Sequence, residues 1–135
     1  MREIEFRGRD KRLDGTWEPW VYGSLDLSDL GPVIHSGITP PANVEPETIG
    51  QFIGLRDKHG VKIYEGDVVK CIPIRGRGYY GVIKYVTRNA MFELLTRMEG
   101  KLWVLEEYEE LEILGNIFDN PQYQEFYGEV YQDET

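Results

Sequence analysis

The sequence predicts a mainly β chain: an N-terminal β-hairpin region, then a small antiparallel barrel of the SH3-like or OB-like kind, then a short C-terminal helix. Three observations lead to this prediction. Apolar and polar side chains alternate over short stretches, which is the period of half-buried strands. Turns rich in Gly and Pro separate these stretches at the spacing of small all-β domains. Before residue 120, no helical pattern is long enough to connect parallel strands.

Residues 1–47 form the predicted N-terminal β-rich region. Residues 2–7 alternate charged and apolar side chains, and residues 17–25 are aromatic-rich with Pro19, which favours an edge or a bulge. These two stretches are predicted to pair as a hairpin. Residues 26–32 resemble a loop, residues 33–35 a brief strand, and the proline-rich connector that follows ends the region.

Residues 48–119 form the predicted barrel. A strand at 48–55 leads into the stretch 54–69, where two Gly-containing turns seven residues apart exclude a helix and require a folded-back β segment. Residues 106–110 fit either a helical turn or a loop. The further strands are expected at 67–74, 79–86, 91–95, 102–105 and 111–118.

Residues 120–135 are predicted to form a short helix and an acidic tail. Asn120 precedes Pro121, which is the usual start of a helix, and Tyr123, Phe126 and Tyr127 would share one face of it. From Gly128 onward we expect an acidic end without a core-forming pattern.

Charge is distributed unevenly along the chain. The net charge is −9, from 15 Lys and Arg against 24 Asp and Glu. Residues 1–100 hold 14 of each sign, whereas residues 101–135 hold one Lys and ten acids. Between Arg56 and Lys101 there are ten basic and five acidic side chains. This polarity suits self-association or a charged partner, and its simpler interpretation is a solvated acidic tail.

Composition also indicates the cellular compartment in which the protein is expected. Cys71 is the only cysteine, so an internal disulfide is excluded and a buried thiol in a reducing interior is expected. No apolar run approaches the length of a membrane span, and the first residues do not resemble a signal peptide. We therefore expect a cytoplasmic protein without a membrane partner.

Gly76-Arg77-Gly78-Tyr79-Tyr80-Gly81 is literally a G-x-G-x-x-G motif. A dinucleotide site requires a helix after these glycines so that its N–H groups face the pyrophosphate. Residues 82–86 are β-branched and aromatic instead. The glycines are therefore predicted to permit a tight hairpin between two strands.

Two sets of side chains are candidate contact residues. The first mixes guanidinium groups with rings that could stack on bases and meet phosphates, although the acidic chain is opposite in charge to a dedicated nucleic-acid binder. It consists of Arg75, Arg77, Tyr79 and Tyr80. The second is an aromatic hairpin expected to mediate self-association. It consists of Trp17, Trp20 and Tyr22.

Neither catalytic, cofactor-binding nor metal-binding residues are predicted. His35 and His59 have no second ligand at metal-site spacing, and no Ser lies in a nucleophile-elbow context. We therefore expect a protein that is not an enzyme and takes no cofactor.

Several segments together resemble the YopX family of phage and prophage proteins. They run in the family's order over most of the chain: 2–8, the 17–23 hairpin, 48–57, 63–69 and 113–121. The resemblance implies a β-rich N-terminal part, an SH3-like barrel, phage or prophage origin and a tendency to assemble. It implies no activity and no catalytic residues.

These observations lead to one expected function and one alternative. We expect a non-enzymatic accessory protein of a phage or prophage that acts through protein contacts, either as a homo-oligomer or with a phage or host protein. The alternative is a nucleic-acid-binding module that uses the hairpin at residues 75–80. A small hydrolase or metal enzyme would require converging polar groups in a pocket.

Overall fold

The computed structural model describes residues 2–11, 19–38, 40–97, 100–102 and 108–133, and these form two compact units, Met1–Gly54 and Leu55–Thr135. These units divide at Gly54, whereas the sequence prediction placed its domain boundary after residue 47. The reason is strand β5 (Gly50–Arg56), whose residue Gln51 pairs with Phe6 of β1 (Phe6–Arg9) and so ties β5 to the N-terminal unit.

The first sheet is antiparallel throughout its described pairings and has the order β4-β3-β2-β1-β5-β6. The predicted hairpin is confirmed: β1 pairs with β2 (Trp20–Ser28). The loop predicted at 26–32 is wrong, because β2 continues to Ser28 and β3 (Gly31–His35) begins three residues later. The remaining elements are β4 (Ala42–Asn43), the 3-10 helix η1 (Pro46–Thr48) and β6 (Lys62–Tyr64).

The core of the N-terminal unit lies between the β1–β2 hairpin and the segment around β4. Ile34 and Val44 are fully buried there. Gly8 is required by this packing, because a Cβ at that position would lie 3.0 Å from the Cβ of Val44. The connector, with two of its residues in β4, thus belongs to the packing of this unit.

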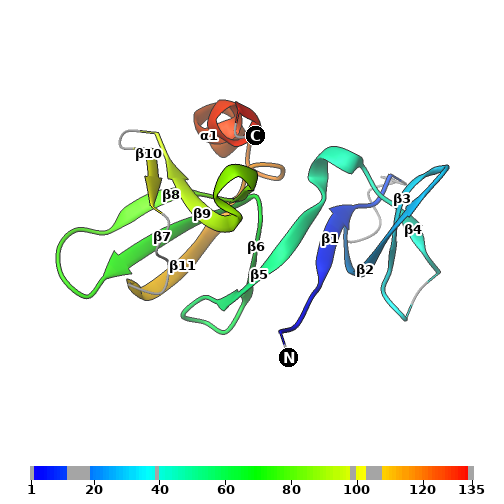
Figure 1. Ribbon diagram of the computed structural model, residues 1–135, viewed down its shortest axis with the longest axis horizontal. Coiled ribbons are helices and arrows are strands. Elements are labelled where there is room, and N and C mark those ends of the chain that lie inside the picture. The colour runs from blue at the N-terminus through cyan, green and yellow to red at the C-terminus, as the bar shows by residue number, and fades with distance from the viewer. Residues whose placement is uncertain (1, 12–18, 39, 98–99, 103–107, 134–135) are drawn as a thin grey trace. The chain divides into compact units, whose positions relative to one another are not determined.

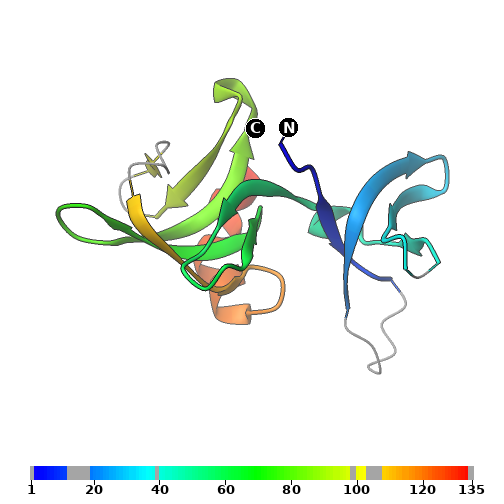
Figure 2. The same ribbon diagram turned by 90° about the horizontal axis from the view of Figure 1, so that it is seen from below.

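The second sheet, also antiparallel, has the order β10-β9-β8-β7-β11 (Figures 1 and 2). Its strands are β7 (Asp67–Pro73), β8 (Tyr79–Val86), β9 (Met91–Thr96), β10 (Gly100–Leu102) and β11 (Tyr108–Asn116), with the 3-10 helix η2 (Thr87–Asn89) between β8 and β9. The chain is therefore mainly β, as predicted. These pairings do not define a closed barrel, so the SH3-like barrel stays a prediction.

Helix α1 (Pro121–Asp133) covers one face of the second sheet (Figure 1). Tyr127 is buried among apolar side chains of the sheet and of the segment after β11, and Val130 and Tyr131 pack against the same cluster. The predicted acidic tail after Gly128 is thus wrong over residues 128–133, because a third and fourth turn of the helix bring further apolar residues onto the sheet. The sheet side of the cluster is formed by Val68, Val82, Val86 and Leu95, with Ile117.

Candidate functional site

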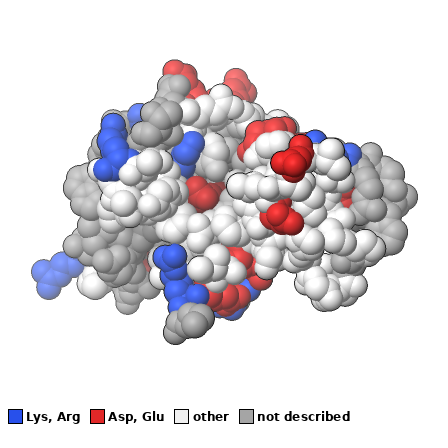
Figure 3. Space-filling view, turned by 45° about the vertical axis from the view of Figure 1, so that its right-hand side comes forward, with Lys and Arg blue, Asp and Glu red and all other residues white. Residues whose placement is uncertain are grey.

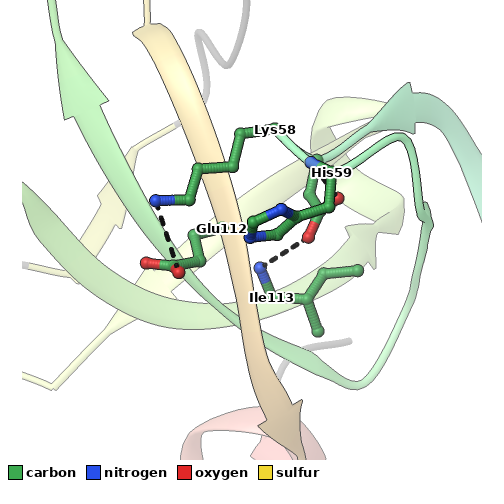
Figure 4. A network of polar contacts seen from close by, with 5 residues as sticks. Lys58, His59, Glu112 and Ile113 are labelled. Atoms are coloured by element: carbon green, nitrogen blue, oxygen red, sulfur yellow. Dashed lines mark hydrogen bonds and ion pairs between the residues drawn. The ribbon is translucent and has the colours of Figure 1, made fainter.

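The stretch 54–69, where the sequence concentrates its turns, is organised by the carboxylate of Asp57. The backbone N–H groups of His59 and Val61 donate to its Oδ1 at 2.9 and 3.0 Å. The N–H of Ile113 donates to its Oδ2 at 3.3 Å (Figure 4). Burial acts to raise the pKa of Asp57, but these three donors and nearby His59 outweigh it and hold the pKa below its usual value. The carboxylate therefore closes the β5–β6 turn and fastens it to β11.

The next turn is held in the same way. Oδ2 of Asp67 accepts a hydrogen bond from the backbone N–H of Tyr64 at 2.8 Å, and Oε2 of Glu65 accepts one from the N–H of Tyr85 at 2.9 Å. Side-chain carboxylates at this turn thus bind backbone groups within the turn and on β8. This arrangement is structural.

Gly66 and Asn116 complete this set of fold-determining residues. Gly66 has φ +91°, and a Cβ there would lie 2.7 Å from the ring of Phe118. Its N–H donates to the carbonyl of Ile83 and its carbonyl accepts from Ile117. Oδ1 of Asn116 accepts hydrogen bonds from the backbone N–H groups of Phe118 and the following residue. The side chains of Asp57, Asp67 and Asn116 therefore accept hydrogen bonds from backbone N–H groups that hold these turns.

A different group of side chains lies on the sheet face beside α1, and we call it the aromatic–basic row. It consists of Lys70, Tyr80, Arg97 and Phe126. Lys70 and Tyr80 are directly paired across β7 and β8, with the ammonium 5.8 Å from the ring centroid. The β8–β9 register pairs Val82 with Leu95, and exposed Arg97 comes directly after the end of β9 at Thr96.

The row continues from the sheet onto the helix. The guanidinium carbon of Arg97 lies 5.5 Å from the ring centroid of Phe126, which is the range of a cation–π contact. The two rings of the row, those of Tyr80 and Phe126, are each 51% exposed. Burial raises the pKa of the neighbouring Tyr127 hydroxyl, and the nearby hydroxyls of Tyr123 and Tyr80 raise it further. The row thus consists of two exposed aromatic residues, each with a cation over its ring, next to the buried Tyr127.

The candidate contact residues at 75–80 do not share one face. Arg75 and Arg77 are exposed in the loop between β7 and β8, as the glycine-permitted hairpin predicted. Tyr79 and Tyr80 are consecutive in a strand, so their side chains point to opposite faces of the sheet. Only Tyr80 belongs to the row. Sequence reasoning missed Arg97 and Phe126, which lie far along the chain and join Tyr80 only through strand register and helix packing.

The two aromatic hairpin residues that the structure describes, Trp20 and Tyr22, differ in burial. Trp20 is buried at 7% exposure, and the guanidinium of Arg7 lies 4.5 Å from its ring centroid. Tyr22 is 41% exposed, and Trp17 lies outside the described residues. Tyr22 is therefore the member of this set that the described structure leaves accessible, and self-association through it stays a prediction.

The most exposed apolar residues of the N-terminal unit include two at the end of the β2–β3 hairpin. Leu27 is 77% exposed and Leu30 is 92% exposed. Asp26 and Asp29 flank them, and both are exposed. These four residues, the hairpin tip, combine apolar and negatively charged side chains. Ile34 pairs with Leu25, the residue before Asp26, and is fully buried. The hairpin is therefore buried at this level and exposed at its tip.

On the face drawn in Figure 3, acidic and basic side chains occur in small separate groups on a largely uncharged surface. Among the residues that the structure describes, no group of three or more His, Cys, Asp or Glu side chains could hold a metal ion. The described part of the chain also contains no helix that is long and apolar enough to cross a membrane. The hairpin tip and the aromatic–basic row are the two candidate contact surfaces considered below.

The chain is a mainly antiparallel β protein of two units, and its C-terminal helix packs on the sheet of the second unit. The chain belongs to the YopX protein family, whose sequence pattern matches residues 5–125. This span includes the hairpin tip and nearly the whole row, with only Phe126 just beyond it. No curated protein matches the chain.

Proposed function

We propose that this chain is a non-enzymatic accessory protein of phage or prophage origin that acts through protein contacts, including contacts between its own copies. The origin rests on family membership. The observation that supports the contacts is the hairpin tip, where two leucines are exposed on a hairpin whose base is buried. Exposed apolar side chains grouped in this way mark interaction surfaces.

The distribution of polar residues supports a binding role over catalysis. The most strongly held carboxylates, those of Asp57 and Asp67, accept hydrogen bonds from backbone N–H groups at structural turns. A catalytic acid or base must instead reach a substrate. The exposed surfaces carry leucines, rings and cations, which are the side chains of an interface.

Light scattering coupled to size-exclusion chromatography tests this proposal. We expect a mass above that of one chain that rises with concentration, and a shift toward the monomer in the double variant Leu27→Ser/Leu30→Ser. Both residues are exposed, so the fold should tolerate the change. Ile4→Ser, which alters another exposed apolar residue of the same unit, is the matched control. A monomeric mass for the wild-type chain at all practical concentrations would refute the proposal.

A nucleic-acid-binding function is the second candidate, and the aromatic–basic row favours it. Rings flanked by cations can stack on bases and meet phosphates of a single strand. Arg75 and Arg77 in the adjacent loop would add phosphate contacts. Fluorescence anisotropy with a labelled single-stranded oligonucleotide should then show salt-dependent binding that weakens in Tyr80→Ala and in Arg77→Ala. Arg2→Ala is the charge-matched control, and the absence of any signal at low salt would remove this candidate.

A further inference from the structure

We propose that the hairpin tip of one copy docks on the aromatic–basic row of a second copy, so that copies associate head to tail. This inference rests on the proposed protein contacts and names both surfaces. The tip alternates acidic and apolar residues, with Asp26 before Leu27 and Asp29 before Leu30. The row presents two cation–ring pairs, Lys70 with Tyr80 and Arg97 with Phe126.

The two surfaces are complementary in kind. Leucine methyl groups pack well on aromatic rings, and each ring of the row is half exposed. Desolvation of such a contact favours association in proportion to the apolar surface that is buried. The apolar parts of the tip and of the row can therefore shield each other from water when the two surfaces dock.

The charges are also complementary. The tip carries two aspartates, of which Asp26 lies 3.5 Å from Nε2 of His35 and keeps a 61% exposed side chain. The row carries Lys70 and Arg97. The acid on the β11 side of Lys70, Glu112, already forms a 3.5 Å ion pair with Lys58. Among the residues that the structure describes, Lys70 and Arg97 are thus the charged members of the row, and both are positive.

The row's neighbouring loop enlarges this acceptor surface. Ile74 is 73% exposed, and Arg75 and Arg77 follow it in the same loop. An acidic and apolar hairpin meets here a basic and apolar loop. Opposite potentials at the two surfaces would favour this pairing over tip-to-tip or row-to-row contacts, because these place like charges together.

The geometry of such a contact differs from that of a symmetric dimer. Tip and row are different surfaces in different units, so the contact is heterologous. Each copy then uses one tip and one row. Repetition of the contact gives a closed ring or an open chain, and the mass should exceed that of a dimer at high concentration.

Charge reversal distinguishes this contact from other modes of self-association. We expect Asp26→Lys/Asp29→Lys to weaken association by about tenfold or more, and Lys70→Glu/Arg97→Glu to do the same. An equimolar mixture of the two variants should restore association, because each reversed surface then meets a reversed partner while each unchanged surface meets an unchanged one. Analytical ultracentrifugation of each variant and of the mixture measures this.

Two controls fix the interpretation. Glu45→Lys/Glu47→Lys makes the same change in net charge within the N-terminal unit, away from the tip, and Arg2→Glu/Lys11→Glu does so for the opposite sign. Both should associate like the wild-type chain. Association that weakens as salt rises from about 0.05 to 0.5 M supports the electrostatic part of the contact.

Two results would overturn the inference and leave the proposed function standing. In the first, the wild-type chain associates and the tip variant associates more weakly, but the row variant associates like the wild-type chain. In the second, the mixture of the two variants associates no better than either variant alone. If the row variant instead loses binding to a labelled single strand while association is unchanged, the row serves nucleic acid and the docking is refuted. A wild-type chain that stays monomeric refutes the docking and the protein-contact proposal together.

Discussion

Removal of the buried Asp57 carboxylate should destabilise the C-terminal unit more than a substitution at any exposed position of the stretch 54–69. Asp57→Ala leaves three backbone N–H groups, those of His59, Val61 and Ile113, without their acceptor. A buried donor that loses its partner costs about 1–3 kcal/mol. His59 and Val61 lie in an exposed turn where water can replace the carboxylate, so we expect a total loss of about 2–4 kcal/mol in the free energy of unfolding.

Asp57→Asn is the matched comparison. An amide oxygen can still accept the two hydrogen bonds that reach Oδ1, but the amide nitrogen faces the N–H of Ile113 and cannot accept from it. The loss should therefore be smaller than for Asp57→Ala, about 1–2 kcal/mol. Hydrogen exchange should accelerate at the Ile113 amide in both variants, and at the Val61 amide mainly in Asp57→Ala.

Acid should reduce the difference between the wild-type chain and Asp57→Asn. Because the folded-state pKa of Asp57 lies below its unfolded value, the carboxylate stabilises the fold above the unfolded pKa, and this contribution disappears as pH falls through the folded pKa. Asn does not titrate, so its stability lacks this component. Urea unfolding at neutral pH and in the acid range below about pH 4 measures the gap.

One result would contradict this reasoning about Asp57. If Asp57→Ala unfolds within about 0.5 kcal/mol of the wild-type chain, with an unchanged denaturant slope, the three hydrogen bonds do not hold the turn. An unchanged exchange rate at Ile113 would lead to the same conclusion. The β5–β6 turn would then owe its place to apolar packing alone.

Three further outcomes follow from burial and close contacts. Tyr127→Ala should cost about 3–5 kcal/mol of unfolding free energy because it opens a cavity under α1, whereas Phe126→Ala on the exposed side should cost well under half of that in the same urea titration. Gly81→Ala should destabilise by about 1–3 kcal/mol, since its Cβ would lie 2.5 Å from the carbonyl oxygen of Leu95; a neutral effect on thermal unfolding would contradict the register. Burial raises the pKa of Cys71 to about 12, so a thiol reagent at pH 8 should modify it only at the rate of unfolding; rapid labelling of the native chain would show that the thiol is accessible.

Local patterns in the sequence predicted the hairpins well. The end of the alternating stretch 2–7 and the aromatic stretch after it pair as β1 and β2, and Gly76 and Gly78 lie between the paired strands β7 and β8. Both depend on neighbours within a few residues, where side-chain period and turn chemistry decide the outcome. The turns at 57–60 and 65–67 were found for the same reason.

The errors arose where packing over a distance decided the structure. The helix was predicted to lose its core pattern after Gly128, yet Val130 and Tyr131 pack on the sheet. The spacing of Tyr123, Tyr127 and Tyr131 by four residues was a usable signal, because such residues share one helix face. The loop predicted at 26–32 is likewise two strand ends, since pairing of Leu27 with Pro32 outweighs the weak strand preference of the residues there.

The aromatic–basic row could not be predicted in full from one sequence. Lys70 and Tyr80 are near in sequence, but Arg97 reaches the row through the β8–β9 register and Phe126 through the docking of α1. A single sequence does not specify which strands are neighbours, and the charge of the whole chain conceals a local basic surface. The candidate site therefore emerged only with the pairing of strands.

The residues that identify the family and the residues proposed to bind a partner are different sets under different constraints. Asp57, Gly66 and Asn116 are held by the backbone around them, so their substitution should lower stability and affect binding only as the fold is lost. Leu27 and Tyr80 are exposed, so their substitution should weaken binding at nearly unchanged stability. Unfolding and association measured on the same variants should separate the two sets. A variant of the first set that binds poorly while fully folded would place part of the interface at the turns, because a purely structural residue cannot have that effect.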